Sequence, residues 1–147
     1  MTPTRVLVVD DSAFARKVLR DVLSSQPDLE VVGIARDGLE ALEKVAELQP
    51  DVMTLDLAMP NLDGVGVLRA LGGAARPKVV VVSTADSHSE QGLAALEAGA
   101  VELVHKPTAL ATDRLFELAG ELVEAVRAAA AARAVPPSGS ARVARGP

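Results

Sequence analysis

Five short runs of aliphatic residues alternate along the chain with stretches in which apolar residues recur at helical spacing. These runs, which we interpret as strands, cover residues 5–9, 29–35, 51–57, 78–82 and 101–105. After the first run, Phe14, Val18 and Val22 are spaced to lie on one face of a helix. Strict alternation of strand and helix predicts an α/β domain in which helices cover both faces of a parallel sheet.

The composition of the runs indicates which strands lie inside the sheet. Residues 6–9 and 79–82 are continuously aliphatic, and the third run is nearly so. Such strands are buried on both faces and occupy central positions. Glu30 and Glu102 interrupt the other two runs, which we therefore place at the edges. Strands one, three and four are expected to form the interior of a five-stranded sheet.

Polar residues mark the expected helix boundaries. Asp37 with Glu40, and Ser87 with Glu90, fit the capping box, in which a side chain closes the first turn and a carboxylate follows three residues on. The last helix is expected to begin near Thr112.

The composition is typical of a soluble globular protein and excludes several functions. A length of 147 residues suits one domain with a sizeable core. The absence of cysteine excludes disulfides, thiol catalysis and cysteine-based zinc sites. A net charge of −5 is unfavourable for direct binding to nucleic acid or an anionic membrane. No run is long enough to cross a membrane and no signal-peptide pattern is present, so we expect a cytoplasmic protein without membrane insertion.

The end of the chain differs from the rest in composition. Pro136 and Pro137 cannot continue a helix, and the residues after them offer nothing that could pack into a core. We therefore expect a domain at residues 1–133, followed at 134–147 by a flexible tail or a truncated linker. The arginines of this tail also suit a basic arm for a polyanion, but scattered arginines without aromatic residues are more typical of a solvated segment.

Side chains that can perform chemistry follow four of the five predicted strands. In strand order they are Asp10 and Asp11, then Asp56, then Ser83 and Thr84, and finally Lys106. Because ligands of open parallel sheets bind at the carboxyl ends of the strands, we expect these groups to meet. Adjacent carboxylates cannot all stay ionised without a cation, and oxygen ligands favour Mg²⁺ or Mn²⁺.

Simpler structural roles do not account for the whole set. An aspartate at a strand end often caps the next helix, but Ser12 can cap the helix after Asp11. Asp56 lies among aliphatic residues, where an unpaired carboxylate is costly. Lys106, an ordinary surface residue on its own, becomes a partner for a bound anion beside such a cluster. The groups together indicate phosphoryl transfer to Asp56 as nucleophile, with a metal, a lysine and a hydroxyl stabilising the phosphoryl oxygens.

Four motifs resemble those of response-regulator receiver domains, in matching order and spacing over about residues 4–128. They are Val-Leu-Val-Val-Asp-Asp-Ser at 6–12, Leu-Asp-Leu-Ala-Met-Pro-Asn-Leu-Asp-Gly at 55–64, Val-Val-Val-Val-Ser-Thr-Ala at 79–85 and Lys-Pro at 106–107. The stretches 10–16, 50–56 and 96–100 further resemble the receiver of the chemotaxis protein-glutamate methylesterases. The resemblance implies a flavodoxin-like (βα)5 sandwich with strand order 2-1-3-4-5.

The resemblance also implies a role for each site residue. Asp56 would accept a phosphoryl group from a sensor histidine kinase of the chemotaxis type, and a downstream output domain or protein would respond. Asp11, Asp56 and the backbone carbonyl of Ala58 would bind Mg²⁺ directly, with Asp10 acting through water. Lys106 would contact the phosphoryl oxygens, and its peptide bond to Pro107 is expected to be cis. Receivers phosphorylate and dephosphorylate themselves, so no separate enzyme active site is expected.

Two positions are less clearly assigned by these patterns. Counting aliphatic residues along the fourth strand selects Ser83 as the hydroxyl that contacts phosphate, whereas the family's Thr-Ala pair selects Thr84; we favour Ser83. Leu103 stands three positions before Lys106, where receivers usually carry an aromatic residue that turns inward on phosphorylation. This leucine argues against output through an aromatic side chain.

The same residues bear on three other functions. The main alternative is the regulatory N-terminal fragment of a protein-glutamate methylesterase with its catalytic domain missing, since no Gly-x-Ser-x-Gly motif is present. A phosphatase with an aspartate nucleophile is disfavoured because Ala58 stands where its second aspartate would be. A dinucleotide-binding domain is disfavoured because the glycine pattern at 64–66 lacks its third glycine. Neither His88 nor His105 is expected to be a ligand.

Overall fold

A single parallel sheet of five strands forms the centre of the molecule. The computed structural model describes residues 2–72, 76–84, 89–106 and 112–132, the last range without the side chains of residues 112–116. The strands are β1 (Thr4–Val9), β2 (Leu29–Ala35), β3 (Val52–Leu55), β4 (Lys78–Ser83) and β5 (Glu102–His105). They pair in the order β2-β1-β3-β4-β5, which confirms the predicted topology.

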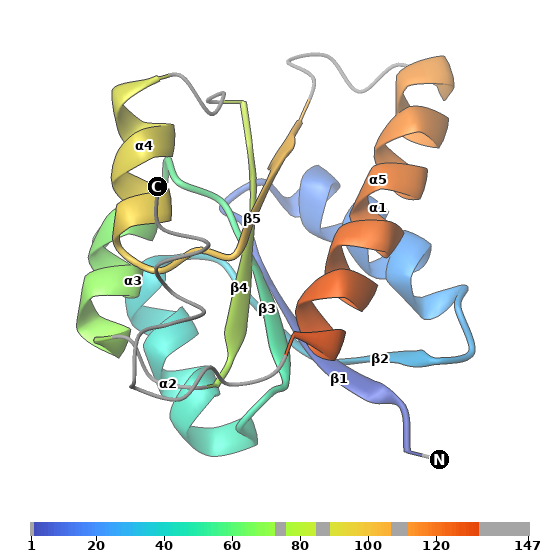
Figure 1. Ribbon diagram of the computed structural model, residues 1–147, viewed down its shortest axis with the longest axis horizontal. Coiled ribbons are helices and arrows are strands. Elements are labelled where there is room, and N and C mark those ends of the chain that lie inside the picture. Colours follow the sequence, from blue (N-terminus) through green and yellow to red (C-terminus); the bar gives the residue numbers. More distant parts are fainter. Residues whose placement is uncertain (1, 73–75, 85–88, 107–111, 133–147) are drawn as a thin grey trace.

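Helices cover both faces of this sheet, as Figure 1 shows. The helices α1 (Ala13–Ser24) and α5 (Thr112–Ala131) pack on one face. On the other face lie α2 (Gly38–Leu48), α3 (Gly64–Leu71) and α4 (Glu90–Glu97). The result is the three-layer α/β sandwich that the alternation of strand and helix predicts.

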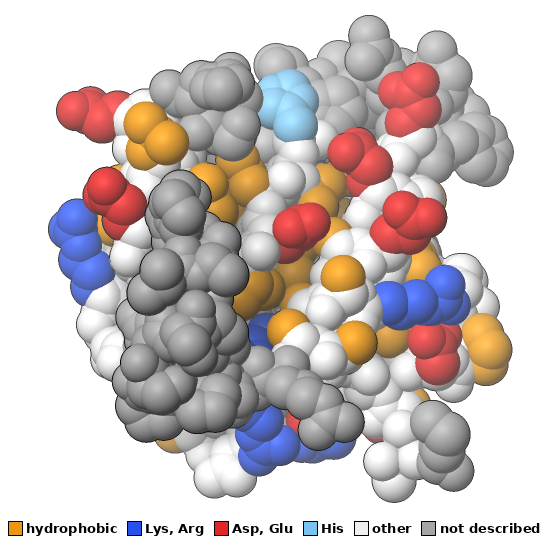
Figure 2. Space-filling view, in the orientation of Figure 1, with side chains coloured by type: hydrophobic (Ala, Val, Ile, Leu, Met, Phe, Trp, Pro, Cys, Tyr) orange, Lys and Arg blue, Asp and Glu red, His pale blue; other side chains and the backbone are white. Residues whose placement is uncertain are grey.

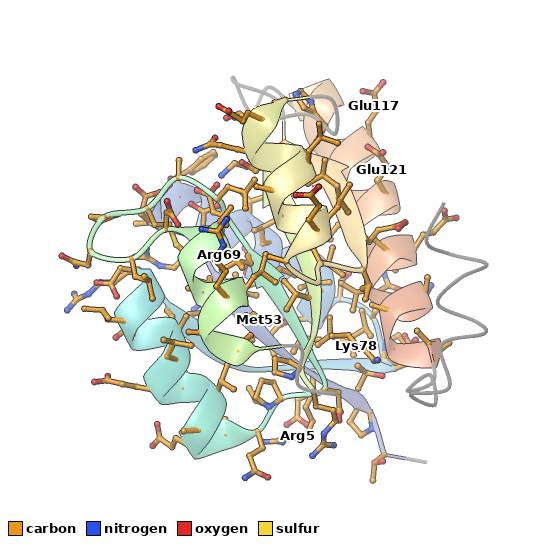
Figure 3. The ribbon with its side chains drawn as sticks, turned by 60° about the vertical axis from the view of Figure 1, so that its left-hand side comes forward. Arg5, Met53, Arg69, Lys78, Glu117 and Glu121 are labelled. Carbon is orange, nitrogen blue, oxygen red and sulfur yellow. The ribbon has the colours of Figure 1, made fainter. Side chains whose placement is uncertain are left out.

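The alternation of side chains along the strands divides the core into two clusters. Val8 and Val80 belong to the cluster under α1 and α5, whereas Met53 and Val81 belong to the cluster under α2, α3 and α4, and Figure 3 shows Met53 inside the latter. All of β3 is buried, while Glu30 on β2 and Glu102 on β5 are exposed. The prediction of central and edge strands is therefore confirmed.

Capping residues set the beginning of each helix on the α2 side of the sheet. The Asp37 carboxylate accepts the backbone N–H of Glu40 at 2.8 Å, and the Glu40 carboxylate accepts the backbone N–H of Arg36 at 2.8 Å. The prediction of a capping box at Ser87 is wrong, because α4 begins at Glu90 with Ser89 as its N-cap. Ser89 is one residue before the helix, and its hydroxyl accepts the N–H of Gly92 at 3.0 Å.

The last helix carries an acidic outer surface. Glu117 and Glu121 are exposed on α5 and point outward in Figure 3, and acidic side chains gather over this side of the molecule in Figure 2. None of the helices in the described part of the chain is both long and apolar enough to span a membrane. The predicted tail at 134–147 lies outside the described residues, so the boundary at residue 133 stays a prediction.

Candidate functional site

The carboxyl end of β1 places two carboxylates at the edge of the sheet. Asp10 is fully buried and its backbone N–H donates to the carbonyl of Ala35 at the end of β2. Asp11 follows it and is exposed. Ser12 is the N-cap of α1, its hydroxyl accepting the N–H of Ala15 at 3.2 Å. The predicted alternative, in which Asp10 or Asp11 serves as the cap, is therefore excluded.

The end of β3 brings a third carboxylate to the same place. The backbone N–H of Asp56 donates to the carbonyl of Val9, which fixes Asp56 beside the end of β1. Its side chain is nearly buried, and one carboxylate oxygen lies 3.4 Å from the N–H of Ala58. One oxygen from each of Asp10, Asp11 and Asp56 lies within 4.8 Å of the other two. The predicted convergence of these carboxylates is thus present in the structure.

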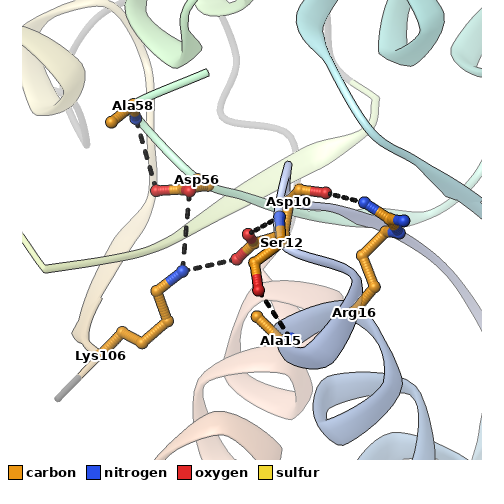
Figure 4. A network of polar contacts seen from close by, with 7 residues as sticks. All are labelled: Asp10, Ser12, Ala15, Arg16, Asp56, Ala58 and Lys106. Carbon is orange, nitrogen blue, oxygen red and sulfur yellow. Dashed lines mark hydrogen bonds and ion pairs between the residues drawn. The ribbon is translucent and has the colours of Figure 1, made fainter. Parts of the chain in front are cut away.

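Lys106 extends from the end of β5 into this cluster. Its backbone N–H donates to the carbonyl of Ser83, and its side chain is almost buried. The ammonium Nζ lies 2.6 Å from one oxygen of Asp10 and 3.6 Å from one oxygen of Asp56. Figure 4 shows the lysine between the two carboxylates. The closer partner is therefore Asp10, a preference that the sequence did not indicate.

Arg16 is a contact of the site to which the sequence patterns assigned no role. Arg16 closes the first turn of α1, and its guanidinium donates to the backbone carbonyl of Asp10 at 2.7 Å (Figure 4). The other Asp10 oxygen, not bound by Lys106, accepts the N–H of Ser12 at 2.9 Å. Every polar group of Asp10 thus has a partner. The signal available in the sequence was a basic residue six positions after Asp10, near the start of the next predicted helix.

The electrostatics of the site favour an added cation. Burial of Asp56 and then repulsion from Asp10 raise the pKa of the Asp56 carboxyl, against the opposing effects of Lys106 and the Ala58 N–H. Within the described residues, Lys106 is the ammonium that contacts this cluster of three carboxylates, through Asp10 and Asp56. A cluster of hard oxygen donors with excess negative charge suits a small divalent cation.

The two candidate hydroxyls on β4 differ in burial and in direction. Ser83 is the last residue of β4 and is buried, whereas Thr84 is exposed. Along β4, Val81 packs in the cluster under α3 and α4, and Val82 packs in the cluster under α5. Continued alternation places Ser83 on the same side of the sheet as Val81, and Thr84 on the same side as Val82. By the same alternation, Asp56 lies on the side of Thr54, which pairs with Val80 on the α5 side.

The remaining predicted positions are partly described. Leu103 is half-buried and packs against the cluster under α4, opposite Val81 of β4. His105 is exposed, in agreement with an ordinary surface histidine. His88 and the peptide bond between Lys106 and Pro107 lie outside the described residues.

Comparison with known proteins identifies relatives of the whole domain. The family described as the response regulator receiver domain matches residues 6–119. The chain is 72% identical over 138 residues to protein-glutamate methylesterase/protein-glutamine glutaminase 5 of Myxococcus xanthus, covering 93% of this chain and 40% of that protein. It is 49% identical over 129 residues to the corresponding protein of Thermotoga maritima, covering 85% of this chain and 37% of the relative. The chain therefore spans well under half the length of these curated relatives.

Solved structures agree with the sequence relatives. The response regulator domain of Thermotoga maritima CheB superimposes with a TM-score of 0.82 and 44% identity, covering 90% of this chain and 99% of that domain. A chain of the CheX-CheY-BeF3-Mg²⁺ complex of Borrelia burgdorferi superimposes with a TM-score of 0.67 and 27% identity, covering 82% and 90%. The chain is thus a member of the response regulator receiver domain family, of the type found in the CheB chemotaxis proteins.

Proposed function

We propose that this receiver is a phosphorylation switch in which Asp56 accepts a phosphoryl group from the phosphohistidine of a sensor kinase in a Mg²⁺-dependent reaction. One observation carries the proposal. The carboxylates of Asp10, Asp11 and Asp56 converge within 4.8 Å, and the ammonium of Lys106 lies beside them. Clusters that combine a nucleophile, oxygen ligands for a metal and a fixed cation are typical of phosphoryl-transfer sites.

The metal assignment follows from the donor set. Asp11 and Asp56, with the backbone carbonyl of Ala58, would hold Mg²⁺ directly, and Asp10 would act through water, because both Asp10 oxygens already accept hydrogen bonds. Mn²⁺ suits the same oxygen ligands. The Borrelia complex, which contains a receiver relative together with BeF3 and Mg²⁺, supports this assignment. Bound Mg²⁺ supplies charge neutralisation at the phosphoryl oxygens.

Asp56 is the proposed nucleophile because its carboxylate is buried yet lacks a strong hydrogen bond. Its contact with Lys106 is 3.6 Å and its contact with the Ala58 N–H is 3.4 Å. A carboxylate oxygen of Asp56 attacks phosphorus while the bond from phosphorus to the histidine nitrogen breaks. The imidazole leaves with the electron pair of that bond and needs no general base on the receiver. After the transfer, the Lys106 ammonium lies within reach of the phosphoryl oxygens, and a contact with them replaces its contact with the Asp56 carboxylate oxygen.

The hydroxyl that contacts the phosphoryl group is open to a direct test. The strand alternation supports Thr84, which lies on the same side of the sheet as Asp56, over Ser83, which the count of aliphatic residues along the strand favours. We expect Thr84→Ala to slow phosphorylation more than Ser83→Ala. The reverse order would restore Ser83 as the contact.

The partners we propose follow from the type of receiver. A sensor histidine kinase of the chemotaxis system is the proposed donor, in the cytoplasm, and a protein-glutamate methylesterase domain is the proposed output, because that name is carried by the relatives. Leu103 occupies the usual aromatic switch position and is already half-buried under α4. Output is therefore proposed to use repacking of aliphatic side chains at this surface.

The proposed function is tested by intact mass spectrometry. The chain is incubated with a small phosphodonor and Mg²⁺, and we expect it to gain one phosphoryl group. EDTA and Asp56→Asn should each abolish the gain. Asp21→Asn, which removes an exposed carboxylate paired with Lys17 on α1, should leave it unchanged. A chain that gains no phosphoryl group from the small donor or from a panel of kinases would refute the switch.

A further inference from the structure

The loop between β3 and α3 is seated on the beginning of α2. The loop, residues 56–63, begins at Asp56 and contains Ala58, whose carbonyl is the proposed third metal ligand. Further along it, the Asn61 side-chain amide donates to the carboxylate of Asp37 at 2.8 Å. Asp37 lies 24 residues earlier in the chain and is the N-cap of α2. Two segments that are distant in sequence are thus joined, and one of them follows Asp56 in the chain.

The backbones of the two segments also touch. A Cβ atom added to Gly38, the first residue of α2, would lie 2.1 Å from the carbonyl oxygen of Leu62. Only glycine leaves room for so close an approach. Asn61 has a positive φ of 70°, a conformation that asparagine tolerates better than most residues. The loop therefore reaches α2 in a shape that two specific residue types permit.

The Asp37 carboxylate serves both segments at once. One oxygen accepts the N–H of Glu40 and caps α2, and the other accepts the Asn61 amide. The hydrogen bond from Glu40 and then that from Asn61 lower the pKa of the Asp37 carboxyl, so the group is ionised at neutral pH. A charged acceptor makes the contact to Asn61 stronger than one between neutral groups.

Both ends of the loop are fixed independently of this contact. The N–H of Gly64 donates to the carbonyl of Leu57 at 2.9 Å, and the Asp63 carboxylate caps α3 through the N–H of Gly66 at 2.8 Å. Between these ends, Met59 and Leu62 pack partly buried against the core cluster under α2, α3 and α4, and the Asn61 amide supplies the side-chain hydrogen bond to α2. The apolar packing holds the loop against the core, and the hydrogen bond from Asn61 adds a directional contact that sets the course of the backbone after Ala58.

We propose that the hydrogen bond between Asp37 and Asn61 is a latch that holds the β3–α3 loop in the shape that presents Ala58 to the metal, so that both are positioning residues for metal binding. The inference rests on the proposed function, because it needs the metal site described above. Neither residue contacts the metal. Their effect is expected on the affinity for the cation rather than on the chemistry at Asp56.

The pair allows a test in which its two side-chain types are exchanged. Asn61→Gly removes the amide, keeps the left-handed backbone accessible and leaves the net charge unchanged. The double variant Asp37→Asn with Asn61→Asp reverses the direction of the hydrogen bond, also conserves net charge, and retains an N-cap, because asparagine caps helices about as well as aspartate. Asn61→Asp alone places two carboxylates in contact. Asp21→Asn is the control for loss of an unrelated surface carboxylate.

The measured quantity is the dissociation constant for Mn²⁺, from electron paramagnetic resonance titration with Mg²⁺ as competitor. We expect Asn61→Gly to weaken Mn²⁺ binding about fivefold, the equivalent of one hydrogen bond of about 1 kcal/mol. The Mn²⁺ dissociation constant of Asn61→Asp should differ from that of the exchanged double variant. The dissociation constant of the double variant should return to within about twofold of the wild-type value. Thermal melts in EDTA, run in parallel, report any loss of stability without metal.

The outcomes separate this inference from the proposed function. If the wild type binds Mn²⁺ and is phosphorylated but Asn61→Gly binds Mn²⁺ equally well, the latch is refuted and the switch stands. The latch is also refuted if the variants lower the melting temperature without changing Mn²⁺ affinity, or if the exchanged pair is as weak as Asn61→Gly. If the wild type binds Mn²⁺ but accepts no phosphoryl group, the switch is contradicted. The latch is then still tested by the Mn²⁺ titrations of the variants. A wild type that binds no Mn²⁺ contradicts both.

Discussion

Thr54 is a buried hydroxyl inside an otherwise aliphatic layer, and its replacement by valine should stabilise the fold. Among the buried side chains that the structure describes, its Oγ1 is a polar atom without a hydrogen-bond partner. Thr54 is fully buried on β3 between Val8 of β1 and Val80 of β4. An unpaired buried hydroxyl costs about 1–3 kcal/mol, and a buried methyl group adds about 0.8 kcal/mol.

We therefore expect Thr54→Val to raise the free energy of unfolding by about 1–3 kcal/mol, because valine has nearly the same shape and needs no hydrogen bond. Each kcal/mol corresponds to roughly 3–5 °C in Tm for a domain of this size. The assay is urea unfolding followed by far-ultraviolet circular dichroism, since the chain has no tryptophan or tyrosine for fluorescence. An unchanged m-value would show that the gain belongs to the native state.

The neighbouring strand supplies a matched control. Val6→Thr on β1 adds a hydroxyl to the same buried layer, where Val6 pairs with Val52 and not with Thr54, and should lower the free energy of unfolding by a similar amount. If Thr54→Val is neutral or destabilising while Val6→Thr is destabilising, the Thr54 hydroxyl has a partner such as a buried water. That result would refute the reasoning from an unpaired group.

Three further predictions follow from the site and its loop. Asp56→Asn should stabilise the metal-free protein. Because folding raises the pKa of Asp56, the wild type loses stability as the pH rises from about 3.8 through the folded-state pKa. In urea unfolding, the stability advantage of the variant should grow over this pH window and then level off. Mg²⁺ at 100 times its dissociation constant should stabilise the wild type by about 2.7 kcal/mol, with EDTA or Asp11→Asn removing the shift in calorimetry. Gly38→Ala should cost at least about 1–3 kcal/mol, because the added methyl meets the Leu62 carbonyl; an unchanged Tm would contradict this contact.

The sheet could be predicted from the sequence because burial leaves a direct mark on strand composition. A strand buried on both faces must be aliphatic throughout, so β1, β3 and β4 are recognisable as central, and Glu30 and Glu102 identify the edges. The convergence of Asp10, Asp11 and Asp56 follows from the same topology, since the carboxyl ends of adjacent parallel strands meet. These inferences need no knowledge of side-chain conformation.

Other features depend on tertiary contacts that leave no local signal. Ser87 and Ser89 both suit an N-cap, and the hydrogen bond to Gly92 decides for Ser89. The ammonium of Lys106 lies 2.6 Å from an Asp10 oxygen and 3.6 Å from an Asp56 oxygen. The conformation of the lysine side chain sets this difference of 1.0 Å. The contact between Asp37 and Asn61 joins segments whose spacing along the chain carries no periodic pattern.

The position of the phosphoryl group is the most direct test of the central claim. After incubation with a small phosphodonor and Mg²⁺, the chain is reduced with borohydride, which converts an aspartyl phosphate to homoserine, and is then mapped by peptide mass spectrometry. The account predicts homoserine at position 56 alone, and none when EDTA replaces Mg²⁺. Homoserine at Asp10 or Asp11, or at no position, would contradict it.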